Sequence, residues 1–154
     1  MASVVFIDTS ILCNLVPVPG RNQDEDEVRE QMKHRLAEGE MFILPITAVI
    51  ETGNFIGQLS SGAERRTTAS KFDALLRLIC AGQAPWVLHD VAWNREFLEQ
   101  LLDGASTGTD YVQHAQNKVG AGDLCILTER EQYRARAQIS AELWTLDGAL
   151  SAHN

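Results

Sequence analysis

Cysteine is scarce in this sequence, and no long hydrophobic run interrupts it. Only three cysteines occur among the 154 residues, and no two of them have the C-x-x-C spacing of a zinc or redox motif. The odd number and their apolar neighbours predict reduced thiols in the core of a cytoplasmic protein. The opening apolar run ends at Asp8 and has no basic segment before it, so we expect neither a signal peptide nor a membrane span.

Basic residues are also few. Lys and Arg total 13 against 21 Asp and Glu, which gives a net charge of −8. A protein that coats nucleic acid through a broad basic face usually has the opposite sign. The balance does not exclude a nuclease that brings its positive charge as metal ions. Much of the acidity lies in residues 24–40, which hold seven acidic and three basic residues and are a candidate partner surface.

Several nucleotide and catalytic motifs are missing. The four histidines lack zinc-site spacing, and Gly120-Ala121-Gly122 lacks the third glycine of a dinucleotide-binding loop. No phosphate loop ending in Gly-Lys-Ser/Thr and no Gly-x-Ser-x-Gly elbow occurs. These absences argue against a zinc domain, a nucleotide-loop enzyme and an α/β-hydrolase.

What the sequence does contain is an alternation of short apolar runs with amphipathic segments. We expect strands over residues 4–7, 41–44, 86–89 and 143–146. We expect helices from capping signals at Asp24, Thr47, Ser61, Asn94 and Thr109, and a last one from Asp123 to about Ala137. This order predicts an α/β protein with a mainly parallel central sheet and helices on both faces, in a single domain over residues 1–154.

Four acidic residues stand where ligands bind in such a sheet. Asp8 and Asp147 directly follow the first and last strands, Glu51 lies in the first turns of the helix after the second strand, and Asp123 follows a Gly-Ala-Gly break. The carboxyl ends of parallel strands meet at one edge, so these side chains can converge there. Converging carboxylates repel one another unless cations lie between them. Mg²⁺ or Mn²⁺, which prefer oxygen ligands, could bind a phosphodiester and activate water there.

Each of these residues also has a local interpretation. Asp8 could cap a helix, Glu51 could favour a helix dipole, Asp123 could be an N-cap, and Asp147 could open a terminal turn. The neighbouring hydroxyl residues could orient the carboxylates or make only local turn bonds. These residues are Thr9, Ser10 and Thr145.

Four stretches of the chain resemble a PIN domain. The most specific is the opening hydrophobic-Asp-Thr-Ser-hydrophobic signature, and the other three match in order and spacing. The stretches are Val5-Phe6-Ile7-Asp8-Thr9-Ser10-Ile11-Leu12, Pro45-Ile46-Thr47-Ala48-Val49-Ile50-Glu51, Val119-Gly120-Ala121-Gly122-Asp123-Leu124-Cys125-Ile126-Leu127 and Leu143-Trp144-Thr145-Leu146-Asp147.

The resemblance implies a three-layer α/β/α fold and a Mg²⁺- or Mn²⁺-dependent ribonuclease. Asp8, Glu51, Asp123 and Asp147 would match the acidic quartet of the family, which serves as catalytic and metal-binding residues. Ser10 and Thr145 match the positions that support the site. Bacterial members are often toxins that are held inactive by a small protein antitoxin and form homodimers.

Basic side chains could hold the RNA substrate. Two groups lie on expected helices, and the alternative for each residue is a solvated helix face with local ion pairs. The groups are Arg65, Arg66, Lys71 and Arg77 on one helix, and Arg130, Arg134 and Arg136 on the other.

Two other functions are possible from the same residues. One is a non-catalytic PIN-fold module that binds a partner, against which the intact acidic quartet argues. The other is a phospho-acceptor signalling domain with Asp90 after the third strand. That chemistry expects an acidic pair after the first strand and a lysine after the last, whereas Thr9, Ser10 and Asp147 occupy the corresponding positions.

Overall fold

The computed structural model describes residues 3–154 and contains one sheet of four parallel strands. The strands are β1 (Val4–Ile7), β2 (Met41–Ile43), β3 (Trp86–Val87) and β4 (Ala141–Trp144). The helices are α1 (Thr9–Leu15), α2 (Glu25–Ala37), α3 (Ile46–Gly57), α4 (Gly62–Cys80), α5 (Arg95–Leu102), α6 (Tyr111–Gln116), α7 (Ala121–Ala137) and α8 (Gly148–Ser151).

The strand order is β3-β2-β1-β4, so the chain adds strands on one side of β1 and then returns to the other side. Val4 pairs with Met41 on one side and with Ala141 on the other. The ladder between β1 and β4 continues past the strand, because the Asp8 N–H donates to the Trp144 carbonyl at 3.0 Å. The order reverses between β1 and β4, and at such a switch point an α/β sheet opens a crevice at its carboxyl edge.

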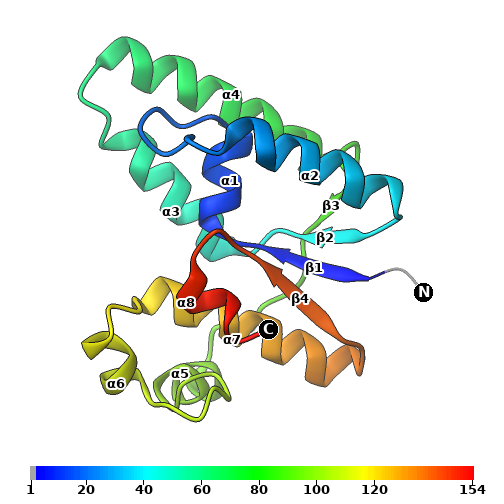
Figure 1. The fold of residues 1–154 in the computed structure, drawn as a ribbon, viewed down its shortest axis with the longest axis vertical. Coiled ribbons are helices and arrows are strands. Elements are labelled where there is room, and N and C mark those ends of the chain that lie inside the picture. Colours follow the sequence, from blue (N-terminus) through cyan, green and yellow to red (C-terminus); the bar gives the residue numbers. More distant parts are fainter. Residues whose placement is uncertain (1–2) are drawn as a thin grey trace.

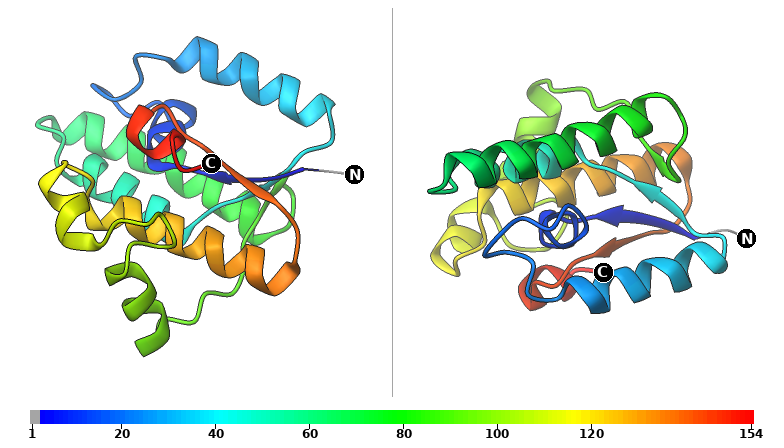
Figure 2. Two further views of the ribbon diagram at one scale, coloured as in Figure 1. Left: turned by 60° about the horizontal axis from the view of Figure 1, so that its bottom comes forward. Right: turned by 90° about the horizontal axis from the view of Figure 1, so that it is seen from above.

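Helices cover both faces of the sheet in three layers, as the sequence predicts (Figure 1). Seen from above, α2 and α4 cross one face, and α7 lies on the other (Figure 2). Helix α1 packs between α2 and α3, while α7 contacts β4, α3 and α5. The strand β1 is buried at all four positions, as expected for a strand covered on both faces.

Several expected boundaries are wrong. Helix α1, which begins directly after Asp8, was not predicted from the sequence. The helix expected to be capped by Thr47 is preceded by Pro45, and the one expected to be capped by Thr109 is capped by Asp110. The last strand ends at Trp144 rather than at Leu146.

The capping signals at Ser61 and Asn94 are confirmed, since their side chains accept from the N–H groups of Glu64 and Phe97. The expected capping box at Asp24 does not form, because its side chain makes no capping bond. The cysteines are free, but only Cys13 is buried; Cys125 is half-buried and Cys80 is exposed. The interpretation of all three as core thiols is therefore wrong for Cys80.

Candidate active site

Asp8 lies at the end of β1, where its side chain caps α1. It is only 3% exposed. Its Oδ2 accepts hydrogen bonds from Ser10 Oγ at 2.8 Å and from Thr145 Oγ1 at 2.7 Å. Its Oδ1 is buried without a partner. A buried carboxylate oxygen without a donor is costly, and it is the kind of atom that a bound cation would satisfy.

The segment after β4 is tied to the same carboxylate. Thr145 donates to Asp8, and its hydroxyl oxygen accepts from the Asp147 N–H at 2.9 Å. Ser10 Oγ accepts from the Leu146 N–H at 3.0 Å. Asp147 Oδ1 accepts from the Ala149 N–H at 2.9 Å and so caps α8. Asp147 thus opens a terminal helical turn, as one interpretation of the sequence predicted, and it also lines the cavity beside Asp8.

Glu51 reaches the site from the second turn of α3. Thr9 Oγ1 donates to Glu51 Oε1 at 2.8 Å, which links the start of α1 to α3. On its other side lies Gly122: a methyl group there would be 2.6 Å from Glu51 Oε2. The second glycine of the Gly-Ala-Gly break therefore matters, because a side chain there would displace the Glu51 carboxylate from this position.

Asp123 occupies the third position of α7, and its Oδ2 accepts from the Gly120 N–H at 3.2 Å. The pKa of Asp123 is raised to about 6, mainly by burial and in part by the negative charges of Asp8, Glu51 and Asp147, while the Gly120 N–H lowers it. The other three carboxylates are therefore close enough to Asp123 to act on its charge.

One cavity of about 390 Å³ brings these groups together. All four predicted acidic residues line it, and so do two of the three predicted hydroxyl residues. These are Asp8, Glu51, Asp123 and Asp147, with Thr9 and Ser10. Thr145 is the third hydroxyl residue, and it reaches the site through its bond to Asp8.

Four polar residues on the cavity wall, Asn14, Arg21, Gln23 and Asp24, were missed from the sequence. Asn14 bridges α1 and the start of α2: its amide donates to the Ser10 carbonyl, and its Oδ1 accepts from the Asp24 N–H. Asp24 adds a fifth carboxylate. Arg21 is the only basic side chain among the described residues of the wall. Its guanidinium lies 3.4 Å from the centroid of the Phe55 ring. Nothing in the Pro-Gly-rich loop before α2 indicated this placement.

The predicted basic residues lie away from this cavity. Arg65 donates to the carbonyls of Leu59 and Ser60, and Arg66 and Lys71 are exposed on α4. None of the three lines the cavity.

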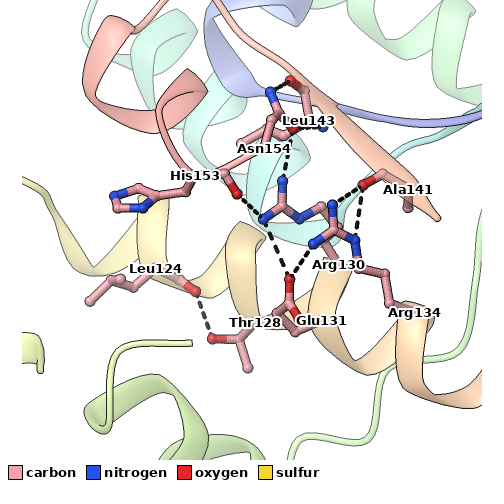
Figure 3. Close-up of polar contacts among 9 residues, drawn as sticks. All are labelled: Leu124, Thr128, Arg130, Glu131, Arg134, Ala141, Leu143, His153 and Asn154. Atoms are coloured by element: carbon pink, nitrogen blue, oxygen red, sulfur yellow. Dashed lines mark hydrogen bonds and ion pairs between the residues drawn. The ribbon is translucent and has the colours of Figure 1, made fainter. Parts of the chain in front are cut away.

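Arg130 and Arg134 have structural roles (Figure 3). Arg130 is only 2% exposed and donates to Asn154 Oδ1 and to the His153 carbonyl. Arg134 donates to the Ala141 carbonyl and to Glu131. Arg130 is thus placed to hold the end of the chain against α7 rather than to meet RNA, which corrects the expectation for that residue.

The residues at the cavity suit a hard divalent cation. The donors are carboxylate and hydroxyl oxygens, and one buried carboxylate oxygen has no partner. In residues 3–154 no three or more His, Cys, Asp or Glu side chains are grouped so that they could hold a metal ion. Mg²⁺ is commonly held through one or two carboxylates while it keeps several waters, so a closed cage is not what it requires.

No protein-family model, curated protein or solved structure matches this chain. In the part of the chain that the structure describes, no helix has the length and apolar character needed to cross a membrane.

Proposed function

We propose that this protein is a Mg²⁺- or Mn²⁺-dependent ribonuclease that hydrolyses RNA phosphodiester bonds. One observation carries the proposal. Four carboxylates from widely separated segments, Asp8, Glu51, Asp123 and Asp147, line one open cavity at the switch point of a parallel sheet. A structural role explains the placement of one or two of them, but not the convergence of all four.

In this proposal Asp8, Glu51 and Asp123 hold the cation, and Asp147 completes the site. The bound ion would supply positive charge for the phosphodiester and the means to activate water. The chain's own residues do the rest. Ser10 and Thr145 fix the orientation of Asp8, and Thr9 fixes that of Glu51.

The substrate and partners follow from the resemblance and the charge. RNA is the proposed substrate, and the protein is proposed to act in the cytoplasm as the toxin of a toxin–antitoxin pair, with a small protein antitoxin and a homodimeric state. Arg21 offers a phosphate contact at the cavity, with Phe55 beneath its guanidinium. The acidic helix α2 is a candidate surface for the antitoxin, since its first turn holds three acidic residues.

The experiment compares wild type with Asp8→Asn and Asp123→Asn on an end-labelled RNA, with Mn²⁺ and with EDTA. Asparagine preserves the shape of each side chain and the capping capacity of Asp8. We expect metal-dependent cleavage to fall by about 100-fold or more in both variants, because each loses a charge at the proposed cation site.

The matched control is Asp103→Asn, which removes an exposed carboxylate at the end of α5 that does not line the cavity. Its activity should equal that of wild type. Mn²⁺ titration by calorimetry supplies a readout that does not need the right RNA. Failure of wild type to bind Mn²⁺ would overturn the proposal and favour a non-catalytic interaction module.

A further inference from the structure

A second cavity, of about 550 Å³, lies at the carboxyl ends of β2 and β3. None of its lining residues lines the acidic cavity. Three of its lining side chains are large, apolar and exposed: Ile46, Ile50 and Trp93 are 59%, 56% and 69% exposed. Phe97, which is fully buried, lines it too. An apolar cavity with a few polar groups is the usual form of a small-molecule site.

Thr47, His89, Asp90 and Glu129 are the polar and charged residues of its wall, and two of them each have one buried atom without a partner. Glu129 is 0% exposed. Its Oε1 accepts from Thr47 Oγ1 at 3.3 Å, but its Oε2 has no partner. His89 Nε2 is 3.9 Å from Glu129 Oε2, which is too long for a hydrogen bond, and that nitrogen also lacks a partner.

The position and the protonation of His89 are both constrained. Its ring packs edge-on against Phe6 and Tyr133, with centroids 5.4 and 5.7 Å away. An Arg136 guanidinium nitrogen lies 3.2 Å from His89 Nδ1. Arginine can only donate, so this contact assigns Nδ1 as the acceptor and places the proton of the neutral ring on Nε2. The two unpartnered atoms of the wall are therefore one donor, His89 Nε2–H, and one acceptor, Glu129 Oε2.

A single hydroxyl satisfies both groups, since it can accept from one and donate to the other. An oxygen at a hydrogen-bond distance of about 2.8 Å from each atom fits their separation. We propose that this cavity binds a small phenolic ligand, whose hydroxyl bridges His89 and Glu129 while its ring packs among Ile46, Trp93 and Phe97. Both polar atoms are closed to solvent, so binding requires a local opening of the cavity wall beside them.

Other ligand classes fit this pair less well. An ammonium group would suit Glu129 but would point its protons at the His89 donor. A carboxylate would suit His89 but would meet the Glu129 charge. A purely apolar ligand would leave both buried groups unpaired, which costs free energy.

The test is a calorimetric titration of the whole protein at pH 8 with four probes of similar size: p-cresol, toluene, 4-methylanisole and 4-methylbenzylamine. Burial raises the pKa of Glu129 to about 7, so its carboxylate is ionised at pH 8, whereas a phenol with a pKa near 10 is not. We expect p-cresol to bind about tenfold more tightly than toluene and 4-methylanisole, because each of these loses at least one hydrogen bond. Equal affinities, or tightest binding of the amine, would overturn the proposal.

Two variants locate the binding. His89→Phe keeps an aromatic ring but removes the donor, so it should abolish the preference for p-cresol over toluene. Should His89→Phe fail to fold, the probe series in wild type still decides the matter. Asp8→Asn should leave p-cresol affinity unchanged, because Asp8 lines the other cavity. A loss of p-cresol binding in Asp8→Asn, or an unchanged preference in His89→Phe, would contradict the assignment.

Discussion

The two cavities at the carboxyl edge of the sheet use carboxylates in opposite ways. At the end of β1 and β4, several acidic side chains share an open, polar cavity, and hydroxyl and N–H donors orient them. At the ends of β2 and β3, one carboxylate is fully buried beside apolar side chains and keeps an unpaired oxygen. Helix α7 contributes to both, through Asp123 in its first turn and Glu129 farther along. In our proposals the same residue type thus serves charge-based binding in one place and a directional hydrogen bond in the other.

The pKa values of Asp123 and Glu129 are raised by different surroundings in the two cavities. Burial is the largest cause of the raised pKa in both Asp123 and Glu129, but neighbouring carboxylates add to it only at Asp123. At Glu129 the Thr47 hydroxyl and the N–H groups of Thr47 and Ile46 act against burial. A cation would therefore relieve Asp123, whereas Glu129 needs an uncharged partner.

The largest expected effect is on stability at Glu129. Its pKa in the folded state, about 7, lies above the ordinary value of 4.5. Between these two pH values the folded state binds more protons than the unfolded state, so the free energy of unfolding falls as pH rises from about 4.5 to about 7. The loss amounts to about 3 kcal/mol. Glu129→Gln should remove it and leave a flatter pH profile in urea unfolding measured in EDTA.

Asp123→Asn is the matched control for that profile. The pKa of Asp123 is raised in the same direction, to about 6, so this variant should flatten a smaller part of the profile at lower pH. If Glu129→Gln has the same pH slope as wild type, Glu129 is not the buried charge that the contrast between the cavities requires.

The next effect concerns the space around Glu51. Gly122→Ala places a methyl group 2.6 Å from Glu51 Oε2, so the carboxylate must move. The helix itself is not weakened, because alanine favours helix more than glycine does. We expect metal-dependent RNA cleavage to fall by about 100-fold, the cost typical of a misplaced site group, with little change in unfolding free energy.

Gly57→Ala is the control for that substitution, since Gly57 ends α3 in open space. It should cleave as well as wild type. Full activity in Gly122→Ala would mean that cleavage does not depend on the position of Glu51. The first cavity would then not require carboxylates in fixed orientations.

The strands and the acidic residues of the first cavity could be predicted from the sequence, but the second cavity could not. Apolar runs over residues 4–7 and 41–44 predict buried strands, which the structure has at Val4–Ile7 and Met41–Ile43. The positions of Asp8 and Asp147 after strands predict their meeting at one edge. Parallel topology makes this inference possible, because it converts sequence order into spatial proximity.

The second cavity could not be predicted in this way. Glu129 lies in the run Glu129-Arg130-Glu131, which is typical of a solvated helix face, yet Glu129 and Arg130 are buried because α7 packs against β4, α3 and α5. Thr47 illustrates the same limit: its hydroxyl donates to Glu129 instead of capping its own helix. Tertiary contacts overrode the local signal at both positions.

A smaller effect is expected at Thr145, which links the two ends of the first site. Thr145→Val removes the donor to Asp8 Oδ2 and the acceptor for the Asp147 N–H, at nearly constant volume. Groups that orient metal ligands typically contribute tenfold or more to affinity, so we expect Mn²⁺ affinity to fall by about tenfold in a calorimetric titration. Thr67→Val, on the exposed face of α4, should leave it unchanged; an equal loss in both variants would assign no orienting role to Thr145.

The smallest effect separates the one basic side chain at the first cavity from those elsewhere. Arg21→Gln removes a charge from the cavity wall but leaves the carboxylates intact, so RNA affinity should fall about threefold and the dependence of log affinity on log salt should lose about one unit of slope. Arg66→Gln, on α4 and away from the cavity, should change neither quantity. Fluorescence titration of a labelled RNA in EDTA, at several salt concentrations, measures both. If Arg66→Gln has the larger effect, RNA lies across α4, and the cavity wall at Arg21 is not part of its path.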